Sequence, residues 1–230
     1  MRFLSILLLP ALAAATAVTP RTACVTDTLD NYIKLGSTGC QVGPLGVVDF
    51  VFTPLLGNNV TILASDVTVS PKAPGPGYSL DITSPKFTAS GAEVVKYLIG
   101  YTWDPGDIRS LDDILNDPPT PPGFSSVTTV ACLDAAFRGN ICPTSTITLS
   151  VFDGIGVQLT ALASFSPPVS TLGIRNTFDI EGGGADAGGS ATIISFGNQS
   201  TVPEPATALT CLAALALLRR WRSSASRARG

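Results

Sequence analysis

The chain has 230 residues, with 14 Lys plus Arg, 17 Asp plus Glu and no histidine, which gives a formal net charge of −3. The absence of histidine excludes Ser-His-Asp and Cys-His nucleophiles, a histidine general base and histidine metal ligands. The few cations exclude strong binding of nucleic acid, and an apolar fraction of 45% is enough to build a folded core.

The N-terminus has the pattern of a signal peptide over residues 1–17. Arg2 precedes the apolar run 3–9, and Ala15-Thr16-Ala17 supplies small residues for cleavage after Ala17. The alternative is an N-terminal membrane anchor, but the apolar run is shorter than the roughly 20 residues that span a bilayer. We therefore expect the signal peptide to be removed on export.

Four cysteines lie in the part that we expect to be secreted: Cys24, Cys40, Cys132 and Cys142. Export to an oxidising compartment favours disulfides, and four cysteines allow three pairings. We favour Cys24–Cys40 and Cys132–Cys142, because each pair is local and encloses a Gly-containing turn. A metal role is disfavoured, because the spacing is not C-x-x-C and no histidine completes a site.

Short β-branched and aromatic runs, separated by Gly, Pro, Asn and Asp, fill the rest of the body. The predicted strands are 47–53, 59–64, 67–70, 78–83, 86–90, 93–103, 127–132, 146–152, 158–165, 171–180 and 191–197. In Ser110–Leu115, Ser110 and Asp113 instead form a capping pattern for a single helical turn. Many short strands without a long helical pattern predict an all-β fold, a single antiparallel β-sandwich-like domain over residues 18–201.

Three carboxylates near the end of the body are candidates for a structural calcium site. Asp179, Glu181 and Asp186 flank a run of three glycines, and flexible oxygen-rich loops suit Ca²⁺. The spacing matches no EF-hand, and a hairpin tip is the simpler interpretation. We expect no other metal or cofactor.

Two further groups of residues suggest the binding or the hydrolysis of sugars. Tyr97, Tyr101 and Trp103 recur on one face of a strand, where they form either a sugar-binding platform or part of the sandwich core. Asp104 to Asp107, Asp112-Asp113 and Asp117 gather carboxylates of the kind that a glycosidase uses in pairs. Nothing else in the sequence marks them as a catalytic cleft, so we expect no enzyme.

The C-terminus forms a second targeting pattern over residues 202–230. Val202-Pro203-Glu204-Pro205 precedes thirteen apolar or small residues, 206–218, which predict a short transmembrane helix. A basic end, 219–230, follows with Arg219, Arg220 and Arg222, which would stay in the cytoplasm. The two ends together hold six cations and one acid, which leaves the body with eight cations, 16 acids and a net charge of −8.

The order of Pro-Glu-Pro, apolar helix and basic end resembles the PEP-CTERM sorting tail of Gram-negative bacteria. The resemblance implies recognition by an exosortase, a membrane protease that cuts near the motif and releases or transfers the protein. The same tail is also labelled the C-terminal domain of ice-binding proteins, a label that follows the tail and not the body. Residues Thr28–Cys40 resemble the start of an uncharacterised group of bacterial proteins that carry this tail.

These patterns together predict a non-enzymatic exported protein with a structural or adhesive role. Its expected partners are the exosortase, the membrane before processing and exopolysaccharide, with no nucleic acid. It would pass through an inner-membrane intermediate to the cell surface or extracellular matrix of a Gram-negative bacterium. The alternatives are a secreted carbohydrate-binding module and, less favoured, a secreted glycan hydrolase.

Overall fold

The computed structural model describes residues 21–72, 77–116, 123–154, 156–184 and 188–202. The predicted signal peptide and the tail beyond Val202, with its Pro-Glu-Pro motif, apolar helix and arginines, lie outside these residues. Within the described ranges, no helix is long and apolar enough to cross a membrane.

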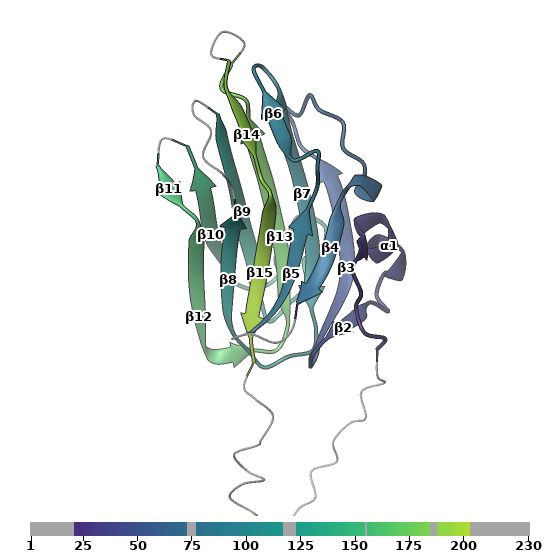
Figure 1. Cartoon of the computed structure of the whole chain (residues 1–230). Coiled ribbons are helices and arrows are strands. Elements are labelled where there is room, and N and C mark those ends of the chain that lie inside the picture. The colour runs from purple at the N-terminus through teal and green to yellow at the C-terminus, as the bar shows by residue number, and fades with distance from the viewer. Residues whose placement is uncertain (1–20, 73–76, 117–122, 155, 185–187, 203–230) are drawn as a thin grey trace, which may run out of the picture.

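Two antiparallel sheets pack face to face and form a β-sandwich, as predicted (Figure 1). The six-stranded sheet contains, in order, β1 (Asp27–Thr28), β4 (Thr68–Lys72), β5 (Tyr78–Thr83), β15 (Ser195–Thr201), β8 (Ile108–Asn116) and β12 (Thr160–Val169). The seven-stranded sheet contains, in order, β11 (Val157–Gln158), β10 (Thr146–Asp153), β9 (Phe124–Leu133), β13 (Leu172–Glu181), β7 (Val94–Trp103), β3 (Leu45–Pro54) and β2 (Cys40–Val42). A short ladder joins β6 (Thr88–Ser90) to β14 (Ser190–Thr192).

Period-two alternation decides which side chains enter the core. Along β13, the inward side chains of Ile174, Asn176, Phe178 and Ile180 are buried, while those of Arg175, Thr177 and Asp179 are half-buried on the outer face. β5 and β15 contribute Leu80, Ile82 and Phe196 from the opposite sheet to the same apolar cluster. The core is therefore the contact between the two inner faces.

One helix, α1 (Leu29–Leu35), covers the β3 edge of the sandwich (Figure 1). Thr28 caps its N-terminus by accepting a hydrogen bond from the Asn31 backbone, and Leu29 and Tyr32 are buried beneath it. The sequence predictions did not include this helix, because seven residues make barely two turns and give too short a stretch of helical periodicity to recognise. A 3-10 turn, η1 (Ala64–Asp66), is the other helical element of the described chain.

Two local predictions were wrong. Ser110–Leu115 belongs to β8 and not to a helical turn, because Leu111, Asp113 and Leu115 all point into the core. The polar Asp113 at an inward position hid the alternation. Residues 59–64 form no strand; their backbone instead leads into η1.

The described chain begins and ends at the same end of the sandwich (Figure 1). Arg21 donates a hydrogen bond to the Asp104 carbonyl, just after the end of β7. Thr201 ends β15 opposite Ser110, near the start of β8. The two segments that carry the predicted targeting signals therefore leave the body from one end.

Candidate functional site

Both predicted disulfides are present. Cys24 and Cys40 tie the first described residues to β2, and Cys132 and Cys142 close a loop after β9. Two disulfides in one body of this size are typical of proteins that work outside the cytoplasm.

The aromatic row on β7 lies in the core, which confirms the core interpretation and rules out the alternative of a sugar platform there. Tyr97, Tyr101 and Trp103 are each at most 2% exposed. Tyr101 stacks on Phe50 and meets Trp103 edge to face, with ring centroids 5.2 and 5.9 Å apart. These rings fill the space between the sheets and cannot meet a glycan without unfolding.

A cluster of polar side chains crosses the interior beside these rings. The Nδ2 of Asn198 on β15 donates to Oδ1 of Asp113 on β8 over 2.6 Å. The Oδ1 of Asn198 accepts from the Tyr101 hydroxyl and from Nδ2 of Asn176, each at 2.6 Å. Thr129 then donates to Oδ1 of Asn176 over 2.8 Å. The cluster thereby links β8 and β15 of one sheet to β7, β13 and β9 of the other.

Asp113 is the ionisable centre of this cluster. Burial raises the pKa of Asp113 to about 7, because the charged carboxylate is removed from water. Hydrogen bonds from Thr129 and Asn198 lower this pKa, and the nearby charge of Asp112 raises it slightly. Oδ2 of Asp113 has no hydrogen-bond partner within the described residues. A raised pKa can mark an active site, but this carboxyl is fully buried and has no open path to a substrate.

The predicted grouping of carboxylates does not form a glycosidase pair. Asp112 and Asp113 are consecutive on β8, so Asp113 points into the core and Asp112 points to the outer face. Asp104 is held near the chain start by Arg21 and accepts a hydrogen bond from Thr171. Asp117 lies outside the described residues.

The two calcium candidates that the structure describes already have a cation. Nζ of Lys96 on β7 lies 3.1 Å from the carboxylates of both Asp179 and Glu181 on β13. These hydrogen bonds raise the pKa of Lys96. The third candidate, Asp186, lies outside the described residues, and the described part of the chain holds no group of three metal-ligating side chains. An ammonium thus lies beside both Asp179 and Glu181, and a calcium site that includes Asp186 stays a prediction.

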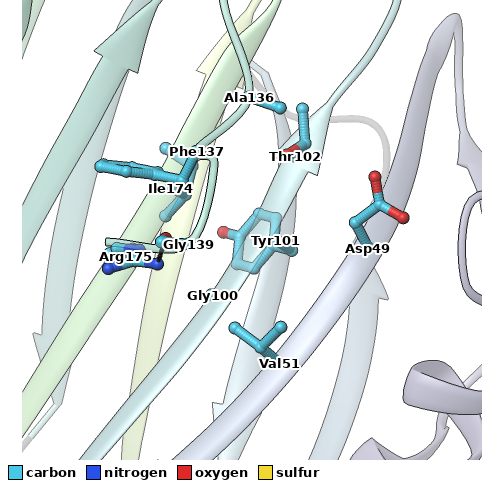
Figure 2. Close-up of a pocket in the computed structure, with 10 residues that line it drawn as sticks. All are labelled: Asp49, Val51, Gly100, Tyr101, Thr102, Ala136, Phe137, Gly139, Ile174 and Arg175. Carbon is cyan, nitrogen blue, oxygen red and sulfur yellow. Dashed lines mark hydrogen bonds between the residues drawn. The ribbon is translucent and has the colours of Figure 1, made fainter. Parts of the chain in front are cut away.

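A hollow of about 230 Å³ lies on the outer face of the seven-stranded sheet (Figure 2). Gly100 lies between its two charged residues, Asp49 on one side and Arg175 on the other. Asp49 sits in a β-bulge of β3 with a φ of 56°, which turns its side chain out of the strand. The remaining wall is Phe137, from the loop that Cys132 and Cys142 close.

Arg175 holds that loop against the sheet. Its guanidinium lies 4.4 Å from the centre of the Phe137 ring, donates to Oδ1 of Asn140 over 2.8 Å and also donates to the Gly139 carbonyl. Partial burial lowers the pKa of Arg175. The cation and the ring are thus engaged with each other, and Asp49 and Thr102 are further polar residues that line the hollow.

A sequence signal exists for two of the buried polar residues, although the predictions made no use of it. Asp113 lies between Leu111 and Leu115, and Asn176 lies between Ile174 and Phe178, in both cases at two-residue spacing. A lone polar residue inside an alternating apolar row marks an inward side chain that needs a partner. Asn198 gives no such signal, because Ser200 on the same face is also polar and buried. Sequence alone does not show which strands bring those partners together.

No family model and no curated protein matches the chain. Among solved structures, the carbohydrate-binding module TmCBM61, in complex with β-1,4-galactotriose, aligns with a TM-score of 0.30 and 12% identity over 76% of this chain and 94% of that chain. The enzymatically active domain of bacteriophage CBA120 tailspike protein 4 aligns with a TM-score of 0.23 and 13% identity over 69% of this chain and 20% of that chain. Both TM-scores are too low to assign a ligand or an activity.

Proposed function

We propose that the chain is a non-enzymatic exported protein that an exosortase sorts to the cell surface or extracellular matrix, where its sandwich has a structural or adhesive role. The resemblance of the tail to PEP-CTERM signals motivates the sorting step. The two disulfides support export. The buried position of Asp113 and the divergent directions of Asp112 and Asp113 count against the glycan hydrolase.

The observation that carries the proposal is the junction between β15 and the tail. β15 lies between β5 and β8 and is paired up to Thr201, and Val202 still packs on the core. Pro203-Glu204-Pro205 follows at once. A protease at the membrane would therefore meet its motif directly beside a folded body, and cutting there would remove no core strand.

The test is expression of the full chain in a Gram-negative host that has an exosortase. We expect the wild-type chain to lose both its N-terminal segment and a C-terminal segment, seen by intact mass, and to reach the surface or medium. The triple variant Pro203→Ala, Glu204→Ala, Pro205→Ala should keep its C-terminal mass and stay in the membrane fraction. A matched double variant, Ser223→Ala with Ser224→Ala, leaves the motif and the arginines intact and should be processed normally.

Two results would overturn the sorting proposal. One is an identical mass and location for the wild type and the triple variant. The other is normal processing in a host from which the exosortase has been deleted. The first would show that the motif does not direct processing, and the second would assign the cut to another protease.

A further inference from the structure

The outer face of the six-stranded sheet carries a trough of about 410 Å³ that crosses β4, β5, β15 and β8. Leu80, Phe196 and Leu115 point into the core at almost zero exposure, so the residues beside them point outward. Those outward residues border the trough: Lys72, Ser79, Asp81, Ile114, Asn116 and Gln199. None belongs to the buried cluster, the calcium candidates or the hollow at Arg175.

The floor of the trough is Gly197. In the strand register, Gly197 stands between Asp81 of β5 and Ile114 of β8. Its two neighbours carry outward side chains and glycine carries none, which leaves a gap between them. A Cβ at this position would lie 3.0 Å from the Asp81 Oδ1 and no nearer than 3.8 Å to any other atom among its contacts. The backbone does not demand glycine here, because the φ angle is outside the left-handed region. The missing side chain thus creates space rather than relieving strain.

The polar groups around the gap are of mixed kind and balanced charge. The Lys72 ammonium is paired with the Asp81 carboxylate, and the Asp81 side chain is only 18% exposed. The amides of Asn116 and Gln199 and the hydroxyl of Ser79 both donate and accept hydrogen bonds. A ligand here would meet hydrogen-bonding groups of both kinds but no net charge.

An apolar side chain completes the border of the trough. Ile114, which lines the trough, is 39% exposed. Sugars combine hydroxyls that donate and accept with apolar C–H faces, so this set of groups matches a pyranose on both counts. Binding sites for small ligands have volumes of roughly 300–1,000 Å³, and the trough falls in this range.

We propose that the Gly197 trough binds a neutral saccharide, with Asp81, Gln199 and Asn116 contacting hydroxyls and Ile114 contacting the ring face. Gly197 stands four residues before Thr201, about 13 Å along β15 from the start of the tail. The inference does not depend on exosortase sorting, because binding is measured on the purified protein.

The test is affinity electrophoresis of the exported, disulfide-bonded protein through gels that contain galactan, dextran, hydroxyethyl cellulose or, as the anionic comparison, alginate. We expect at least one of the three neutral polymers to retard the wild type. Gly197→Leu should abolish the retardation by filling the trough. Gln199→Ala should weaken it by about tenfold through the loss of hydrogen bonds.

The control is Thr177→Leu, which places the same leucine side chain on the outer face of the other sheet and should bind as the wild type does. Thermal unfolding of each variant separates a loss of binding from a loss of folding. If Gly197→Leu proves unstable, Gln199→Ala still tests the proposal, because it changes only an outward side chain. Three outcomes would overturn the proposal: no retardation of the wild type by any neutral polymer, retardation by alginate only, or retardation that Gly197→Leu and Gln199→Ala leave unchanged.

Discussion

Asn198 and Asp113 form a hydrogen bond of 2.6 Å between neighbouring strands, and both side chains are completely buried. Their amide and carboxyl groups stand at positions that alternation assigns to apolar side chains. Buried polar groups of this kind are stable only when they are paired, and Asn198 has three partners: Asp113, Asn176 and Tyr101. Asn198 therefore joins the two sheets through Asn176 and Tyr101, and its bond to Asp113 makes this junction sensitive to the charge of that carboxyl.

The first prediction is that stability falls as pH rises from about 4 to about 7. Burial raises the pKa of Asp113 from 3.8 to about 7, so between these values the folded chain binds a proton that the unfolded chain has lost. The unfolding free energy should therefore decrease across this window, by on the order of 4 kcal/mol from this group, and level off above it. The other titratable groups near Asp113 are Asp112, whose own pKa is raised, and Tyr101, whose pKa is raised well above 10.

Urea unfolding at pH 4.5 and pH 8 measures this effect. Asp113→Asn keeps an oxygen for Asn198 and should remove most of the decrease, because no proton is lost. Asp112→Asn, on the outer face of the same strand, should retain it. An equal pH dependence in the wild type and Asp113→Asn would show that other groups are responsible.

The second prediction concerns the aromatic row. Trp103→Ala should lower the unfolding free energy by about 3–5 kcal/mol, because the indole is fully buried and its removal leaves a cavity. Leu56→Ala is the control, since Leu56 is 98% exposed and should change little. Chemical denaturation measures both. A folded Trp103→Ala protein with unchanged stability and reduced glycan retention would restore the surface platform that the structure rejects.

The third prediction concerns the disulfide between Cys132 and Cys142. Replacing both residues with alanine should reduce the unfolding free energy by about 3 kcal/mol, as expected for a loop with a sequence separation of 10. The loop that presents Phe137 to Arg175 should then lose protection from hydrogen exchange. A reducing agent should destabilise the wild type more than the double variant. Equal sensitivity of the two would mean that this bridge contributes nothing to stability.

The fourth prediction is that calcium does not stabilise the body, since Lys96 already pairs with Asp179 and Glu181. Adding calcium or a chelator should leave the melting temperature of the wild type unchanged. Lys96→Met should lower stability by up to about 1 kcal/mol, because the three groups are partly exposed. In that variant the two carboxylates lose their cation, and calcium should restore part of the stability. A wild type that calcium stabilises strongly would contradict this role of Lys96.

Local patterns predicted the strand content and the antiparallel sandwich. Alternation such as that of Ile174, Phe178 and Ile180 needs no knowledge of the partner strand, because one buried face is enough to produce it. The two disulfides were likewise predictable, since both connect cysteines that are near in sequence. Where an inward residue was polar, as at Asp113, the same reasoning produced a helical turn in place of β8.

Tertiary structure decided which face each functional candidate occupies. For Tyr101 and Trp103 the sequence favoured the core over a sugar platform, and the packing of the second sheet buries both side chains. For Asp179 and Glu181 it favoured a hairpin tip over calcium ligands, and the pairing of β13 with β7 brings Lys96 to both carboxylates. The Gly197 trough draws its residues from four strands spread between Lys72 and Gln199. Sequence records the period of each strand, but the strand order that brings distant side chains together depends on the packing of the whole sandwich.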